Sequence, residues 1–321
     1  MKQFVVILFL LPGLVRAGEL LRIEQNAVAM GTTFTLIAYG EGQENLEQAA
    51  EAAFNEAERL EGMLSNYRPQ SEWSKINREA AKHPVRVTPE LFHLLEACVA
   101  YSQASEGAFD ITVGPLMRVW GFFRGTGSLP PPEQVASVMP SVGYRNLILD
   151  PKTQTVSFRK AGVEIDPGGI GKGYAVDRMI EKLKERNIRS ALISAGGSSI
   201  YAMGNPPGDK GWDVKIRDPR QWSETIEDVY LKDQSMSTSG GYERFFEVDG
   251  KIYSHIMDPR TGYPASGVVS VSVIAPKTID SEAWTKPFFI LGRRWAAKHK
   301  PVGFRVYLCE DKPELSCEWL Q

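Results

Sequence analysis

The sequence predicts a single α+β domain built from mixed or antiparallel sheets with flanking helices. Short runs of β-branched and aromatic residues outnumber the helical stretches and do not alternate regularly with them, which disfavours a doubly wound parallel sheet. No fixed-period repeat or low-complexity linker divides the chain, so residues 18–321 are expected to form one domain. Hydrophobic residues make up 43% of the sequence, enough to bury a large core.

The first residues predict a secretory signal peptide over residues 1–17. Lys2 supplies a positive charge, residues 4–14 form an almost unbroken apolar run, and residues 15–17 offer the small side chains that a signal peptidase reads. The run is shorter than the roughly 20 apolar residues that a membrane span needs. We therefore expect a periplasmic or otherwise exported protein, and the sequence leaves open whether the signal is cleaved or retained as an anchor.

The first half of the chain contains a predicted strand pair and two predicted helices. Residues 23–39 are rich in β-formers and predict the strand pair. Residues 46–64 carry apolar side chains at helical spacing. Residues 89–105 predict a second helix, for which Thr88 is a suitable N-cap.

The second half is richer in predicted strands. A hairpin is expected around Asp150-Pro151, and a later glycine-rich turn separates a strand from a helix. The predicted strands are 147–149, 156–158, 163–166 and 191–194, and the predicted helices are 174–186 and 282–291.

Charge and cysteine content restrict the partners and the redox chemistry. Thirty-seven basic and thirty-nine acidic side chains give a net charge of −2, so no nucleic-acid partner is expected. Cys309 and Cys317 flank a turn-like stretch, where a disulfide and a pair of free thiols both fit an exported protein. Cys98 is expected to be a buried thiol on a helix.

Residues 166–177 contain four glycines and Lys172 between a predicted strand and a predicted helix. Glycine permits positive φ and a close approach of a ligand to the backbone. A helix N-terminus offers free N–H groups and the positive end of the helix dipole. This segment is therefore a candidate cradle for a pyrophosphate, although its spacing matches neither the Walker loop nor the Rossmann fingerprint. A tight turn without a ligand fits the same residues.

Residues 253–264 place His255, Asp258 and Arg260 beside the proline and glycine residues of a turn. Histidine is the side chain best suited to accept a proton near neutral pH, so His255 is a candidate general base. The alternative is a histidine with only a structural role.

Six segments occur in one order along the chain. They are Met30-Gly31-Thr32, Ser65-Asn66-Tyr67 with Ser71 and Asn77, residues 107–112, residues 166–177, Ser237-Thr238-Ser239-Gly240, and residues 255–262. This order resembles the ApbE family, the FAD:protein FMN transferases, over nearly the whole mature chain. The resemblance implies an α+β fold with an FAD cleft and, with Mg²⁺, transfer of FMN to a threonine hydroxyl with release of AMP.

The resemblance also assigns roles to individual residues. Lys172 and His255 are the expected catalytic residues, His255 as the group that removes the acceptor's proton. Gly169, through its backbone carbonyl, and Glu282 are the expected metal ligands. The expected FAD-binding residues are Met30, Tyr67, Asp110, Gly168, Lys172, Ser239, Arg244, His255 and Ile256.

The partners implied are FAD and an exported acceptor flavoprotein with a target threonine, which could also bring the protein to a membrane surface. Two alternatives stay open. One is hydrolysis of FAD to FMN and AMP, with water in place of the threonine. The other is a non-catalytic periplasmic FAD-binding protein.

The expected metal site departs from the family pattern Ala-Asp-Ala-x-x-Thr. Glu282 falls on the Asp and Lys286 on the Thr, and an ammonium group cannot bind Mg²⁺. Lys286 could replace part of the cation's charge, Asp280 and Thr285 could supply ligands in a shifted register, or activity could be lost. Ser198 also stands where an acidic or amide side chain is common.

Gly241 likewise stands where an Asp is common. Fewer acidic groups around a metal–phosphate site lower its affinity for a cation. We therefore expect a weaker or altered metal requirement.

Overall fold

The computed structural model describes residues 20–125 and 127–321. The predicted signal peptide, residues 1–17, lies outside the described residues. Within the described ranges, helices and antiparallel sheets combine as the sequence predicts, and the α+β class is confirmed. None of the helices in these ranges has both the length and the apolarity needed to cross a membrane.

An eight-stranded antiparallel sheet forms the centre of the fold, in the order β1-β2-β6-β7-β10-β15-β16-β17. Its strands are β1 (Leu21–Ala29), β2 (Thr32–Gly40), β6 (Ser190–Ala195), β7 (Ser199–Met203), β10 (Gln234–Gly240), β15 (Val268–Ala275), β16 (Arg305–Glu310) and β17 (Ser316–Trp319). The predicted strand pair 23–39 is β1 and β2, and the predicted strand 191–194 is β6.

Smaller sheets surround this one. Their strands are β3 (Val85–Arg86), β4 (Leu147–Asp150), β5 (Thr155–Phe158), β8 (Trp212–Arg217), β9 (Thr225–Leu231), β11 (Phe245–Val248), β12 (Lys251–Ser254), β13 (Met257–Asp258) and β14 (Tyr263–Pro264). Strands β4 and β5 form the hairpin predicted around Asp150-Pro151.

The helices are α1 (Gln43–Leu64), α2 (Glu72–Glu79), α3 (Pro89–Ala104), α4 (Gly114–Val119), α5 (Pro132–Val138), α6 (Gly171–Glu185) and α7 (Thr278–His299). Thr88 caps α3 as predicted, because its hydroxyl accepts a hydrogen bond from the Leu91 N–H. Helix α7 contains a break at Gly292, whose φ of 73° suits glycine.

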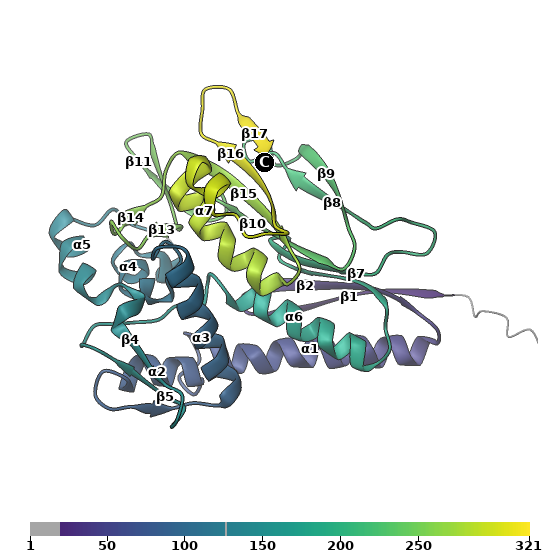
Figure 1. Cartoon of the computed structure of the whole chain (residues 1–321), viewed down its shortest axis with the longest axis horizontal. Helices are drawn as coiled ribbons and strands as arrows, with labels where there is room; N and C mark the ends of the chain where they lie inside the picture. Colours follow the sequence, from purple (N-terminus) through teal and green to yellow (C-terminus); the bar gives the residue numbers. More distant parts are fainter. Residues whose placement is uncertain (1–19, 126) are drawn as a thin grey trace, which may run out of the picture.

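The fold has three layers (Figure 1). Helices α1 and α6 run side by side and pack with β2 and β6 around residues such as Leu36, Ala53 and Val176. Helix α7 covers β15 and β16 through Phe288 and Phe289. The β8–β9 hairpin covers the opposite face of the sheet. Helices α2 to α5 and the β3–β5 sheet gather at one end, beside the glycine turn that precedes α6.

One predicted strand, residues 163–166, is not part of any sheet. Its backbone groups bond to side chains and loops rather than to a neighbouring strand. The N–H of Ile165 donates to Asn77 Oδ1 at 2.8 Å, and its carbonyl accepts from the indole N–H of Trp73 at 3.0 Å. The prediction was wrong because α2, which carries both partners, satisfies this backbone locally.

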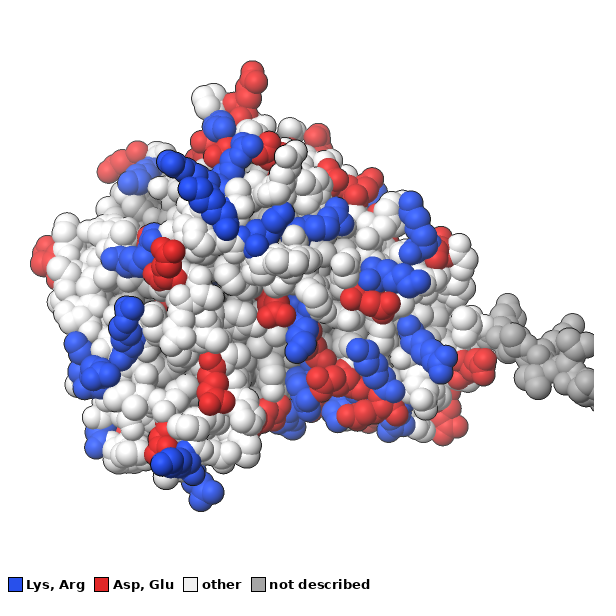
Figure 2. Space-filling model, in the orientation of Figure 1, with Lys and Arg blue, Asp and Glu red and all other residues white. Residues whose placement is uncertain are grey.

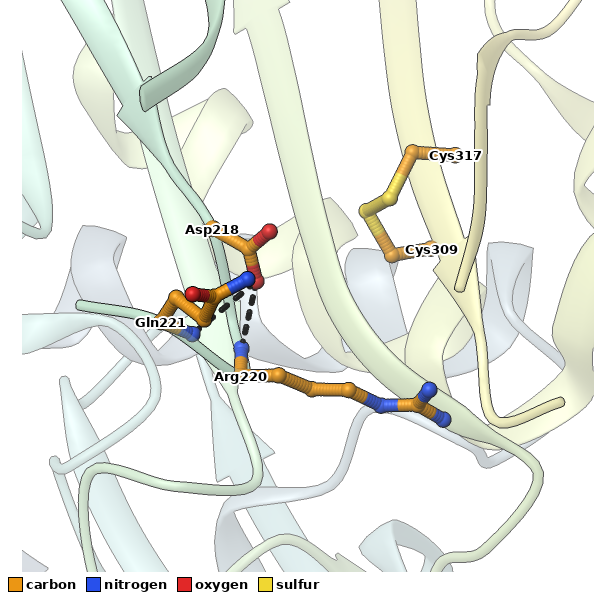
Figure 3. Close-up of a disulfide and its surroundings, with 5 residues drawn as sticks. All are labelled: Asp218, Arg220, Gln221, Cys309 and Cys317. Carbon is orange, nitrogen blue, oxygen red and sulfur yellow. Dashed lines mark hydrogen bonds between the residues drawn. A yellow bond between two sulfur atoms is a disulfide. The ribbon is translucent and has the colours of Figure 1, made fainter. Parts of the chain in front are cut away.

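The disulfide between Cys309 and Cys317 is present and joins directly opposite residues of β16 and β17 (Figure 3). Asp218 accepts hydrogen bonds from the backbone N–H groups of Arg220 and Gln221. The Arg220 guanidinium reaches Asp311 in the loop that joins β16 and β17, at 3.0 Å. The disulfide-closed hairpin is thereby tied to the loop between β8 and β9. Cys98 is a buried free thiol on α3, as predicted.

Acidic and basic side chains are intermixed on the face shown in Figure 2, most densely over its lower part, where α1 and α6 lie in Figure 1. A buried carboxylate organises part of this region. Glu56 accepts hydrogen bonds from Arg59 at 2.8 Å and from Arg178 at 3.3 Å, and both interactions lower the pKa of Glu56. The ion pair of Glu56 with Arg178 links α1 to α6. Arg59 also forms an ion pair with Glu90, which links α1 to α3.

Candidate functional site

A cleft of about 1240 Å³ opens between the eight-stranded sheet, the β8–β9 hairpin and the end formed by α2 to α5. This volume exceeds the 300–1,000 Å³ that is typical of sites for drug-sized ligands. The catalytic, FAD-binding and metal-binding residues that the family resemblance implies all line this one cleft. These residues are Met30, Tyr67, Asp110, Gly168, Gly169, Lys172, Ser239, Arg244, His255, Ile256 and Glu282.

The turn between β1 and β2 brings Met30 into the cleft. Ala29 pairs with Thr32, so Met30 and Gly31 form a two-residue hairpin loop with φ of 51° and 71°. Positive φ at both positions is the geometry that a tight hairpin requires, and a methionine rarely adopts it. The Met30 side chain lies against the glycine turn, where its Cε is 3.4 Å from the position of a Cβ on Gly171.

The glycine turn differs from its predicted form in two ways. None of Gly168, Gly169, Gly171 and Gly173 has positive φ. Their lack of a side chain matters for space instead, since a Cβ on Gly173 would lie 2.5 Å from the backbone oxygen of Thr278. Glycine at this position lets the first turns of α6 and α7 touch.

Most N–H groups of the turn are also already bonded within the protein. Gly168 donates to Asp166, Gly171 donates to the Pro167 carbonyl, and Gly173 donates to the Glu282 carboxylate. The free N–H groups expected from a helix N-terminus are therefore largely used. Positive charge on this wall comes from side chains.

Two of those side chains are lysines on neighbouring helices. Lys172, in the first turn of α6, donates a hydrogen bond to the Ser198 hydroxyl. Lys286, on α7, is half-buried and donates to the Glu282 carbonyl at 3.3 Å and to Thr285 Oγ1 at 3.2 Å. Loss of solvation, with repulsion from Lys172, lowers the pKa of Lys286. The two ammonium groups therefore act on each other in the same part of the cleft.

His255 also lines the cleft, from the segment between β12 and β13. Its Nδ1 is 3.1 Å from the Arg244 carbonyl, which can only accept, so Nδ1 carries the hydrogen and Nε2 keeps a lone pair. Burial, with the nearby charges of Lys286, Arg244 and Lys172, lowers the pKa of His255 to about 4. The ring is neutral at physiological pH and can accept a proton.

Asp258 and Arg260 do not join His255 in the cleft. They form an ion pair with each other at 2.8 Å, and the Asp258 carbonyl accepts from the N–H groups of Thr261 and Gly262. This pair holds the β13–β14 turn. Of the three polar residues singled out in this segment, the structure brings only His255 to the site.

Asp110 lines the cleft but has no free carboxylate oxygen. Its Oδ1 accepts from the Thr112 N–H and hydroxyl, at 2.8 and 2.6 Å, and its Oδ2 accepts from the Tyr144 N–H. Burial raises the pKa of Asp110. It is suited to shaping the wall rather than to binding a cation.

Aromatic side chains stand at the rim. Tyr67 is 73% exposed, as expected of a residue that could stack on a flat ring. Trp222, in the β8–β9 loop, is 54% exposed, and its ring centre lies 5.3 Å from that of Tyr242. The sequence reasoning missed Trp222 and Tyr242, which both line the cleft.

The sequence reasoning also missed Lys215 and Arg217 of β8, which line the cleft. Buried and exposed residues alternate along this strand from Trp212 to Arg217. The period-2 pattern was therefore a signal that could have placed Asp213, Lys215 and Arg217 on one face.

The residues at the expected metal position do not fit Mg²⁺. The Glu282 carboxylate is buried and accepts from Gly173, while the Lys286 ammonium stands beside Gly169, whose Cβ position would lie 3.4 Å from Lys286 Cε. Mg²⁺ requires oxygen ligands in near-octahedral geometry, and an ammonium offers none. In residues 20–125 and 127–321, no group of three or more His, Cys, Asp or Glu side chains is placed to hold a metal ion.

The shifted register does not supply a metal site either. Asp280 does not line the cleft, and its Oδ1 accepts a hydrogen bond from the Tyr101 hydroxyl. Thr285 is buried, with its hydroxyl shared between Ser239 and the Glu282 carbonyl at 2.7 Å each.

The fold and the cleft define an α+β protein whose site suits a long ligand with an anionic centre and flat rings. The chain matches the ApbE family over residues 30–304, and it belongs to that family.

Known proteins agree with this assignment. The chain is 33% identical to an FAD:protein FMN transferase of Klebsiella pneumoniae, with 83% of this chain and 82% of that protein covered. It is 34% identical to an FAD:protein FMN transferase of Treponema pallidum, covering 76% and 71%. The ApbE protein of Thermotoga maritima has a similar structure, with a TM-score of 0.84, 32% identity and coverage of 92% and 96%.

Proposed function

We propose that this protein transfers FMN from FAD to a threonine hydroxyl of an exported redox protein. In this step the threonine oxygen forms a bond to the FMN phosphorus, and the bond between that phosphorus and the bridging oxygen breaks. AMP leaves with the bridging oxygen, and the threonine proton passes to a base. The names of the curated relatives support the reaction, and both relatives are at least 33% identical to this chain.

One observation supports the proposal most strongly. Segments that begin at Met30 and end near Lys286, far apart in the sequence, all meet in one cleft. The cleft has cationic side chains on the wall formed by α6 and α7, aromatic side chains at its rim, and a neutral histidine. A flavin dinucleotide contains the matching groups: a pyrophosphate between two flat ring systems.

Each of these residues has a distinct role in the proposed reaction. His255 accepts the threonine proton at Nε2, while the Arg244 carbonyl holds its ring through Nδ1. Lys172 stabilises the negative charge of the pyrophosphate, since phosphoryl transfer depends mostly on positioning and electrostatics. Tyr67 and the pair of Trp222 and Tyr242 offer stacking surfaces to the rings.

The proposal extends to location. An exported acceptor is consistent with the apolar run at residues 4–14, and such an acceptor could hold the enzyme at a membrane surface. Cell fractionation of the full-length chain tests this part, since recovery only in the cytoplasm would contradict it.

The reaction is tested by incubating the purified protein with FAD and a candidate exported flavoprotein. Mass spectrometry of the acceptor should show the added mass of FMN on one threonine, with an equal amount of AMP released. An acceptor in which valine replaces that threonine is the matched control. AMP release with only free FMN would indicate an FAD hydrolase instead. FAD binding without AMP release from any acceptor would indicate a flavin-binding protein.

A further inference from the structure

Lys172 and Lys286 face the same part of the cleft without a carboxylate partner. Among the described residues, neither ammonium forms an ion pair, and their hydrogen-bond acceptors are the hydroxyls of Ser198 and Thr285 and the carbonyl of Glu282. An ammonium has three N–H donors, and the protein supplies acceptors for only two of those on Lys286. The Glu282 carboxylate is occupied by the Gly173 N–H.

Two such charges side by side are unfavourable in the free protein. Lys286 is half-buried, and its lost solvation and its repulsion from Lys172 disfavour the charged form, which the more distant carboxylates of Glu282 and Glu243 offset only in part. A partly buried charge is ordinarily paired. Neither carboxylate lies within ion-pair distance, so a ligand is the remaining source of negative charge in direct contact, and a pyrophosphate carries negative oxygens on two linked phosphorus atoms that could meet both ammonium groups.

The backbone N–H groups of the glycine turn are not available to bind the pyrophosphate. The N–H groups of Gly168, Gly171 and Gly173 donate within the protein. Lys286 also stands beside Gly169, where a divalent cation would need oxygen ligands, and its charge would repel such a cation.

We infer that Lys286 and Lys172 together hold the pyrophosphate of FAD, so that this protein binds FAD without a divalent cation. The inference rests on the proposed function and specifies how its substrate is held. Lys286 takes the place of the cation by donating directly to phosphate oxygens, as a fixed charge on a rigid helix.

The test is FAD binding by the full-length protein, measured by calorimetry in excess EDTA and again in excess MgCl₂. The wild-type protein should bind FAD equally well in both. Lys286→Met, which keeps the aliphatic stem, should bind FAD about 10- to 100-fold more weakly in both conditions, as expected for loss of a charged hydrogen bond. Lys286→Thr should lose affinity in EDTA and regain it with MgCl₂.

Two controls separate a ligand contact from a structural effect. Lys298→Met removes an exposed lysine from the last turn of the same helix and should leave FAD binding unchanged. Riboflavin has no phosphate, so its weaker binding should be the same in wild type and Lys286→Met. Both Lys286 variants should unfold at or above the wild-type temperature, because they remove an unpaired, partly buried charge.

Wild-type binding that disappears in EDTA and returns with MgCl₂ would overturn the inference alone. Undiminished FAD binding by Lys286→Met would do the same. Failure of FAD to bind under either condition would overturn the proposed function, and the inference with it.

Discussion

Asp177 on α6 caps the N-terminus of α7, because its Oδ1 accepts the N–H of Thr278 at 2.7 Å and its Oδ2 accepts that of Ile279 at 2.9 Å. The N-cap residue of α7 itself, Lys277, makes no side-chain cap. The cap therefore comes from another helix. It fixes the two helix starts against each other at Gly173, and so sets where Lys172 and Lys286 enter the cleft.

Replacing this cap should destabilise the fold. Asp177→Ala leaves two N–H groups without their acceptor and should lower the free energy of unfolding by about 2 kcal/mol. Denaturant unfolding at neutral pH measures this loss. Asp177→Asn retains one acceptor oxygen and should fall between the wild type and Asp177→Ala.

The same residue predicts a pH dependence. Burial raises the pKa of Asp177 to about 6, above the 3.8 of an unburied Asp. Folding thus favours the protonated form, so the part of the stability that is linked to this proton is fully present below pH 3.8 and is lost as the pH rises through 6. The two cap hydrogen bonds are accepted by the ionised form as well and remain at neutral pH. Asn does not titrate, so the stability of Asp177→Asn relative to wild type should increase over that range. A constant difference across the range would contradict the raised pKa.

The sequence predicted elements and site segments better than the contacts between them. Thr88 and the residues after it form a local capping pattern, and α3 begins where that pattern places it. The glycine turn was also found, since four glycines in one short stretch are visible without a structure. The sequence left open whether this segment is a ligand cradle or only a tight turn, and it did not show the contact of α7 with Gly173, because that contact joins residues far apart in the chain.

Helix α2 illustrates the same limit. Only Trp73 and Ile76 among its eight residues are apolar, which is too few to predict a helix from the sequence. Yet its Trp73 and Asn77 bond the backbone of Ile165 and turn the expected strand 163–166 into an irregular segment. Long-range side-chain-to-backbone bonds of this kind leave no periodic signal in one sequence.

Trp222 should contribute to FAD affinity as a stacking surface. Trp222→Ala should weaken FAD binding by about 1–3 kcal/mol, the range measured for stacking of a nucleic-acid base on an aromatic side chain. Trp222→Phe keeps a ring and should retain most of the affinity. Calorimetric titration with FAD measures both, and equal affinity of Trp222→Ala and wild type would remove this residue from the site.

The disulfide should stabilise the β16–β17 hairpin. Replacing both Cys309 and Cys317 with serine should lower the free energy of unfolding by about 2.5 kcal/mol, the loop-closure value for their separation of 8 residues. Denaturant unfolding with and without dithiothreitol measures the loss, and the double variant should no longer respond to the reductant. Cys98→Ala keeps the bridge and should still respond. A wild-type protein insensitive to dithiothreitol under denaturing conditions would contradict a stabilising bridge.

His255 should control the rate of transfer more than the binding of FAD. His255→Ala removes the group proposed to accept the threonine proton and should lower kcat about 10²–10⁴-fold. The dissociation constant of FAD should change much less, because Lys172, Lys286 and the aromatic side chains at the rim are the residues proposed to hold FAD. His93→Ala, which removes a histidine on the surface of α3, is the matched control and should leave kcat unchanged.

The pH profile gives a second test of the same residue. Burial lowers the pKa of His255 to about 4, so the ring stays neutral and able to accept a proton down to that pH in the free enzyme. The acid limb of kcat/KM, which reports the free enzyme, should therefore lie near pH 4.

Bound FAD places phosphate charge in the cleft and favours the imidazolium, which raises the pKa of His255. The acid limb of kcat should accordingly lie at higher pH than that of kcat/KM, and His255→Ala should lose both limbs. An acid limb of kcat/KM near the 6.5 of an unburied histidine, or one that persists in the variant, would show that another group accepts the proton.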